Sequence, residues 1–158
     1  MKYCTTLLLL LSLTTPAWAT ERTLGWGDLM PQLSEIRAQL GIAETDPPQP
    51  LDWQQVQTLL VQELDGQQIR LPGFIVPLSH DDTRVTEFLL VPTYGACIHM
   101  PPPPPNQLLH VHYPDGIEVQ DLQQAVWIYG QIHTEGEDKS GFDAGYRLDA
   151  RAVELYQP

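Results

Sequence analysis

The chain contains little cysteine and little positive charge, and it has no long apolar run beyond its first residues. Its 158 residues include two cysteines, and acidic side chains outnumber basic ones by 20 to 8. Lys and Arg form no cluster, so nucleic acids and anionic lipids, which both require a basic patch, are poor partners. The acidic balance favours cations or basic proteins as partners instead.

Enzyme signatures are also missing. The sequence has no glycine-rich phosphate loop and no serine in a G-x-S-x-G elbow. Cys97 and His99 are a conceivable nucleophile pair, but neighbours on one strand usually cannot place the imidazole in line with the sulfur. We therefore expect that the protein is not an enzyme.

The first 19 residues have the features of a secretory signal peptide. Lys2 supplies the positive start, the apolar stretch is richest at Leu7–Leu11, and Ala17-Trp18-Ala19 provides a small-x-small cleavage pattern. The apolar stretch is shorter than the roughly 20 residues that span a bilayer, and no such run follows it. We expect residues 1–19 to be removed and the mature chain, from Thr20, to be exported without a membrane span.

About 139 residues then remain, enough for one domain with its own core and an N-terminal appendage. Apolar residues recur at helical spacing in residues 26–41 and again in 52–63, with the proline-rich linker 46–50 between them. The predicted organisation is a signal peptide over 1–19, an N-terminal helix and linker over 20–50, and a β domain over 51–158.

From residue 67 onward the apolar period changes to two, which predicts strands. Pro72-Gly73 interrupts the first strand and indicates a bend or bulge, and we expect a turn at Pro114-Asp115-Gly116. Five strands with a kinked first strand are what a small closed barrel of the oligonucleotide/oligosaccharide-binding (OB) type requires. We therefore predict a mainly β, OB-like five-stranded barrel with one or two N-terminal helices. The expected strands are 67–76, 85–91, 108–113, 125–134 and 146–156.

Cys97 and His99 form the most distinctive pair in the sequence. Residues two apart on extended backbone point to the same side. Thiolate and imidazole together suit Zn or Cu far better than Mg or Ca. Because Cys4 leaves with the signal peptide, Cys97 is an unpaired thiol in an oxidising compartment. It is then either buried as a small hydrophobe or kept for metal or redox chemistry.

Pro101–Pro105 follow this pair directly and favour a stiff polyproline II segment. The segment has two interpretations, a docking ligand for an aromatic groove of a partner or a rigid brace for the site. Asn106 and Gln107 come next, and we expect their side chains to hydrogen-bond main-chain groups at the turn.

His110 and His112 are candidates to complete a metal site, since structural zinc sites usually have four ligands. If the proline segment folds back so that 108–113 runs antiparallel to 93–99, Cys97 faces His110 or His112 across the pair. The alternative is that both histidines occupy the solvent face of an alternating strand. His80 and His133 stand near turns without a nearby partner, so we do not assign them to the site.

Two stretches of the sequence carry a family resemblance. Leu89 to Gln107, with Gly95-Ala-Cys-Ile-His followed by the proline run, and Leu64 to Leu78 before it, resemble the exported bacterial family called domain of unknown function 3299. The resemblance covers about residues 53–156. It implies a periplasmic protein of Gram-negative bacteria, often encoded near transport or zinc-responsive genes. It also implies that Cys97, His99, Pro101–Pro105, Asn106 and Gln107 are the hallmark positions.

These observations lead to a main hypothesis and two alternatives. The main hypothesis is a periplasmic metal-binding or metal-handling accessory protein that binds Zn or Cu through Cys97 and His99. The first alternative is a non-enzymatic interaction module for an envelope or transport protein, in which Cys97 is a buried packing residue. The second is a thiol redox role, for which another molecule would have to supply the resolving cysteine.

Overall fold

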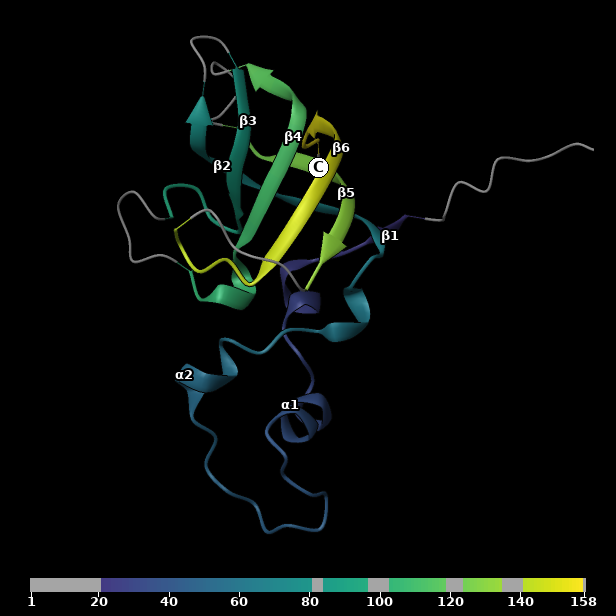
Figure 1. The fold of residues 1–158 in the computed structure, drawn as a ribbon, viewed down its shortest axis with the longest axis vertical. Helices are drawn as coiled ribbons and strands as arrows, with labels where there is room; N and C mark the ends of the chain where they lie inside the picture. Colours follow the sequence, from purple (N-terminus) through teal and green to yellow (C-terminus); the bar gives the residue numbers. More distant parts are fainter. Residues whose placement is uncertain (1–20, 81–83, 97–102, 119–123, 135–140, 158) are drawn as a thin grey trace, which may run out of the picture.

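The computed structural model describes residues 21–80, 84–96, 103–118, 124–134 and 141–157. The predicted signal peptide lies outside these ranges. A β-barrel forms the main body, and the short helices of the N-terminal segment lie at one end of it (Figure 1). None of the helices in the described ranges is long and apolar enough to cross a membrane. The strands are β1 (Arg22–Thr23), β2 (Gln68–His80), β3 (Arg84–Val91), β4 (Leu109–Glu118), β5 (Val126–His133) and β6 (Tyr146–Leu155).

The strand order confirms the predicted barrel. The sheet runs β1-β2-β3-β4-β6-β5, and a further pairing of β2 with β5 closes its last five strands into a ring. Neighbouring barrel strands are antiparallel except β4 and β6, which are parallel. The two-residue strand β1, which the sequence pattern did not predict, adds to β2 in parallel.

The bend in β2 lies at the interruption that the sequence predicted. Gln68–Gly73 pairs with β5, whereas Phe74–His80 pairs with β3, so one strand serves both sides of the closure. A Cβ atom on Gly73 would lie 2.8 Å from the Leu90 Cγ atom and 2.9 Å from the Val91 carbonyl oxygen. Glycine therefore permits the close approach of β2 to β3 at the corner.

The prediction of a turn at Pro114-Asp115-Gly116 is wrong. β4 continues through these residues to Glu118, and its pairing with β3 shifts register between Val85 and Glu87. A register shift of this kind lets a strand absorb turn-type residues as an irregularity without reversing direction. The pairing of β3 with β4 therefore continues to Glu118, beyond residue 113 where the predicted strand ends.

The N-terminal segment, residues 21–64, has shorter helices than the apolar spacing suggested. Met30 and Pro31 separate a 3-10 turn, η1, from helix α1, because a proline cannot continue the preceding hydrogen-bond ladder. The second expected helix is reduced to one turn, α2, whose N-cap Asp52 accepts a hydrogen bond from the Gln54 N–H at 3.0 Å. The bounds are η1 Trp26–Leu29, α1 Leu33–Gln39, α2 Trp53–Val56, η2 Gln62–Leu64 and, before β4, η3 Pro105–Gln107.

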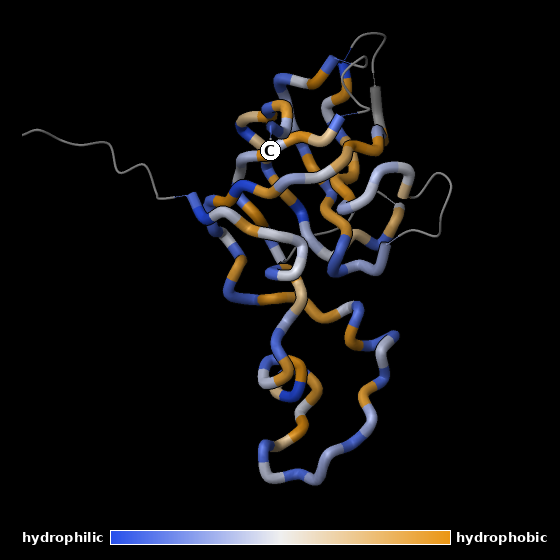
Figure 2. Tube along the Cα trace, turned by 180° about the vertical axis from the view of Figure 1, so that it is seen from behind, coloured by the Kyte–Doolittle hydropathy of each residue, from blue (hydrophilic) through white to orange (hydrophobic). Residues whose placement is uncertain are grey.

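The main core fills the barrel and extends into the N-terminal segment. Leu24, Leu29 and Leu64 join the inward-facing strand residues, and each is at most 2% exposed. The loop farthest from the barrel is mostly hydrophilic, whereas hydrophobic residues recur along the strands (Figure 2). A second, smaller core lies apart from the first and contains Leu89, Val91, Ala96 and Leu108, against which Phe74, Val76, Leu78 and Ala144 pack.

Candidate functional site

The proline run ends in a turn that is tied to the N-terminal segment. Asn106 is 3% exposed, its N–H donates to the Gln57 carbonyl at 3.1 Å, and its Nδ2 lies 3.3 Å from the Val56 carbonyl oxygen. The Gln107 side chain donates to the Trp26 carbonyl at 2.9 Å. Both amides bind main-chain groups as expected, but most of these carbonyls belong to the N-terminal segment. The turn is therefore fixed in place by tertiary hydrogen bonds.

Tyr146, the first residue of β6, adds a further polar anchor at this end. Its side chain is 1% exposed, and its hydroxyl donates to the Leu29 carbonyl at 2.9 Å and accepts from the Val61 N–H at 2.8 Å. Burial raises the pKa of Tyr146 to about 12, although the hydrogen bond from Val61 opposes the rise. One phenol thus joins two parts of the N-terminal segment to the barrel.

His110 lies on the face of β4 opposite the inward-facing Leu109 and Val111. It is 7% exposed, and its register partners are Leu89 on β3 and Arg147 on β6. Leu89 belongs to the second core, so one neighbour of His110 is apolar and the other is charged. The alternative interpretation, that both histidines occupy a solvent face, is therefore wrong for His110.

His112 lies on the same face of β4, one pair farther from the start of the strand, and has a different environment. Its side chain is 49% exposed, and its Nδ1 atom lies 3.7 Å from Glu87 Oε1. Glu87 and Asp149 are its register partners on the two neighbouring strands. The solvent-face interpretation is confirmed for His112, and only His110 is enclosed.

The sequence pattern placed 108–113 antiparallel to 93–99, whereas among the described residues the antiparallel partner of β4 is β3. β4 pairs with Arg84–Val91, and after Val91 the chain turns, with the Ala96 N–H bonding the Thr93 carbonyl at 3.3 Å. Cys97 and His99 themselves lie outside the described residues. Within the described ranges, no group of three or more His, Cys, Asp or Glu side chains is arranged to hold a metal ion.

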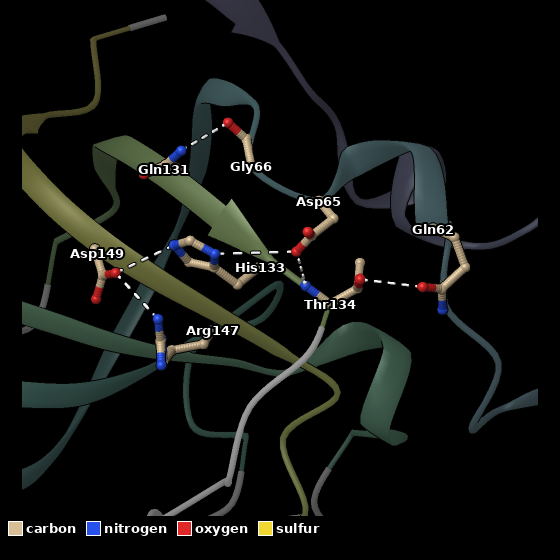
Figure 3. A network of polar contacts seen from close by, with 8 residues as sticks. All are labelled: Gln62, Asp65, Gly66, Gln131, His133, Thr134, Arg147 and Asp149. Atoms are coloured by element: carbon tan, nitrogen blue, oxygen red, sulfur yellow. Dashed lines mark hydrogen bonds and ion pairs between the residues drawn. The ribbon is translucent and has the colours of Figure 1, made fainter.

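The sequence pattern predicted no partner for His133. This expectation is wrong, because the ring lies near two carboxylates. Its Nε2 atom lies 3.1 Å from Asp149 Oδ2 and its Nδ1 atom 3.9 Å from Asp65 Oδ1 (Figure 3). Arg147 Nη2 approaches the same Asp149 oxygen at 3.2 Å. The contact of His133 Nε2 with Asp149 is close but is not a hydrogen bond.

The arrangement around His133 joins three parts of the fold. Asp65 precedes β2, His133 ends β5 and Asp149 lies in β6, and Asp65 also accepts the Thr134 N–H at 2.9 Å. The two ring nitrogens face different carboxylates, so a single metal ion could not engage both pairs at once. The sequence did carry a signal for this contact. His133 and Asp149 each fall at an outward-facing position of the period-two pattern, on two strands that follow one another in the chain.

Comparison with known proteins places the chain in a family. The model of the protein family of unknown function DUF3299 matches residues 26–155. The chain is similar to the crystal structure of a DUF3299 family protein, PA4066, from Pseudomonas aeruginosa PAO1. The two share 35% identity with a TM-score of 0.67, over 87% of this chain and 97% of that one.

Two further solved structures are only distantly similar. They are OBody AM3L15 and OBody AM3L09, each bound to hen egg-white lysozyme, with 11% and 13% identity and TM-scores of 0.37 and 0.38. The matched regions span 71% and 69% of this chain, and 98% and 96% of the two OBody chains. Among curated proteins there is no significant match. The family match and the 35% identical relative together show that this chain belongs to the DUF3299 family.

Proposed function

We propose that this protein is a periplasmic metal-handling accessory protein that binds Zn or Cu through Cys97, His99 and His110. The sulfur and imidazole ligands select these metals over Mg and Ca. The single observation that carries the proposal is the enclosed position of His110 on β4, next to the second core. The acidic surface would raise the local concentration of cations.

The described ends of the connection between β3 and β4 support this ligand set. Ala96, the residue before Cys97, is 2% exposed and packs in the second core with Leu89 and Leu108. Leu89 is the register partner of His110. The residue immediately before Cys97 is therefore packed in the second core, which also contains Leu89, the strand neighbour of His110.

The turn after the prolines supports the proposal from the other side. Asn106 and Gln107 hold it against the N-terminal segment, and the Gly145 N–H donates to the Pro105 carbonyl at 2.9 Å. Metal ligands need supporting contacts that fix their orientation. The proline run thus ends on a rigid base, as the brace interpretation requires.

His112 is the natural control among the four candidate ligands. It lies two residues beyond His110, about 6.6 Å farther along the strand, and it already lies near Glu87. We therefore assign the histidine from β4 to His110 and expect His112 to be dispensable.

Equilibrium dialysis against Zn(II) and, under reducing conditions, Cu(I) tests this assignment. Cys97→Ala, His99→Ala and His110→Ala should lose the tight metal equivalent, and His112→Ala should retain it. Binding should also weaken as pH falls through the histidine range, because neutral imidazole and thiolate are the binding forms. Far-UV circular dichroism of each variant separates loss of the site from loss of the fold. Equal uptake by the folded Cys97→Ala protein would refute the proposal.

A second candidate function is an interaction module for an envelope or transport protein. The observation that favours it is Tyr94, which is 59% exposed and makes an edge contact with Phe74 at a centroid distance of 5.8 Å. Under this proposal Cys97 is a packing residue. A thiol reagent should then label the protein only after denaturation, whereas protection of an accessible thiol by added metal would favour ligation.

A further inference from the structure

An aromatic surface lies on the outer face of β5, near the end of β6 that is remote from Tyr146. Trp127 and Tyr156 lie with ring centroids 5.3 Å apart at an interplanar angle of 37°. Tyr129 follows two residues after Trp127 and so points to the same side of the strand. An open surface hollow is lined by Trp127, Tyr129, Glu154, Leu155 and Gln157. We call these residues, with Tyr156, the aromatic platform.

The rings of the platform are held in place by charged neighbours. The Arg70 guanidinium lies 4.9 Å from the Trp127 ring centroid, and its Nε donates to the Thr23 hydroxyl at 2.7 Å. The Tyr129 hydroxyl donates to Glu154 Oε2 at 2.9 Å. Side chains that are already fixed lose little freedom when a ligand binds, so the platform is pre-organised.

A second cation supports the Tyr129 ring. The guanidinium carbon of Arg151 lies 5.9 Å from its centroid, and the same arginine forms an ion pair with Glu21. The contacts around the two rings thus involve two arginines and two carboxylates, because Arg151 pairs with Glu21 and Glu154 accepts from Tyr129. These four charged groups balance one another, although the whole chain has a net charge of −12.

We propose that the aromatic platform binds a neutral saccharide. One face of a pyranose ring presents C–H groups, which are attracted to the negative face of an aromatic ring. The Glu154 carboxylate can accept hydrogen bonds from sugar hydroxyls, and the Gln157 amide can both donate and accept them. A flat ring bearing neutral polar groups matches both the stacking surface and the local charge balance.

Charged polymers fit the platform less well. A single-stranded nucleic acid would stack on the rings but would meet a strongly acidic chain. A basic peptide would be repelled by the guanidinium groups of Arg70 and Arg151, which lie beside the rings. The aromatic platform is also separate from the proposed metal ligand His110, which lies at the start of β4.

Isothermal titration calorimetry with two neutral tetrasaccharides, cellotetraose and chitotetraose, tests the proposal. At least one should bind saturably in the millimolar range or tighter. Trp127→Ala should weaken binding about tenfold, which corresponds to loss of one stacked ring. Tyr156→Ala should weaken it too, and this variant alters an exposed residue beyond the last strand, so it should not disturb the barrel.

Trp53→Ala is the matched control, because Trp53 is 68% exposed on α2 and does not line the hollow. Its affinity should equal that of the unaltered protein. Absence of binding by both sugars would overturn the proposal, as would equal affinity of the folded Trp127→Ala and Trp53→Ala proteins. Binding of tetralysine or an oligothymidylate through Trp127, without sugar binding, would assign the platform to another ligand and also overturn it. None of these outcomes depends on whether Cys97 binds metal.

Discussion

The barrel and the N-terminal segment are held by different forces. The barrel is a closed ring of paired strands around a continuous apolar core. The N-terminal segment inserts three leucines into that core and adds the two-residue strand β1 to β2. Its other connections include hydrogen bonds from the Trp26 indole to the Pro72 carbonyl and at Tyr146, Asn106 and Gln107. Large exposed side chains remain on it, including Leu33 at 61% and Trp53 at 68%.

The difference indicates that the two regions can loosen separately. Segments with few buried apolar contacts open at a lower free energy than a core sheet does. Because the turn after the prolines bonds to the N-terminal segment, loosening that segment should also loosen one support of the proposed metal site. The following predictions are ordered from the largest expected effect on stability to the smallest.

Substitution Gly130→Ala should damage the barrel most. A Cβ atom there would lie 2.3 Å from the Asp149 carbonyl oxygen, within the paired main chains of β5 and β6. We expect a loss of unfolding free energy of about 3 kcal/mol or more, measured by chemical denaturation. Gly27→Ala, where a Cβ meets nothing within 4 Å, should change stability little. Similar stabilities for the two variants would contradict the close approach seen at Gly130.

Alkaline titration should weaken the connection between the two regions. The pKa of Tyr146 is raised by burial from 10.0 to about 12, so the folded state favours the protonated phenol. Its contribution is fully present below pH 10 and is lost as pH rises towards 12, by about 3 kcal/mol in total. Unfolding free energies between pH 9 and 12 measure this slope. Tyr146→Phe should remove this part of the slope, and an identical slope in both proteins would count against the buried phenol.

Tyr146→Phe should itself loosen the N-terminal segment at neutral pH. It removes one hydroxyl and leaves the Leu29 carbonyl and the Val61 N–H without their buried partner. We expect a loss of about 2 kcal/mol, with faster hydrogen exchange in residues 24–64 than in β3 and β4. Tyr129→Phe, which removes an exposed hydrogen bond to Glu154, is the matched control. Uniform acceleration across both regions would show that they do not open separately.

His133→Gln should have the smallest effect. The ring lies between Asp65 and Asp149, but both carboxylates are about half exposed, and Arg147 remains beside Asp149. Ion pairs in such positions contribute less than about 1 kcal/mol. Thermal unfolding at low and high salt measures the change, with His112→Gln for comparison. A loss as large as that of Tyr146→Phe would show that the His133 contacts are a main support of the barrel.

The barrel could be predicted because its signals are local. Period-two spacing located the five strands, and Pro72-Gly73 marked the bend where β2 changes partner. Pro114-Asp115-Gly116 was misleading, because a strand can absorb turn-type residues as a register shift. The helices were overestimated because apolar spacing did not reveal that single leucines of the N-terminal segment insert into the barrel core.

The candidate site was harder to predict, because strand register depends on the whole sheet. His110 and His112 have the same spacing pattern in the sequence, yet one is enclosed and the other exposed. His133 looked isolated because its partners Asp65 and Asp149 are 68 and 16 residues away in the sequence. Tyr146 gave no polar signal at all, since an inward-facing aromatic residue on a strand ordinarily indicates core packing.

Elemental analysis of the protein, purified without chelators from the cells that produce it, tests the central claim most directly. The account predicts about one Zn or Cu per chain in the unaltered protein and in His112→Ala, and almost none in folded His110→Ala or Cys97→Ala. Metal-free protein that also fails to take up added Zn or Cu would contradict it, as would full metal content in the Cys97→Ala variant.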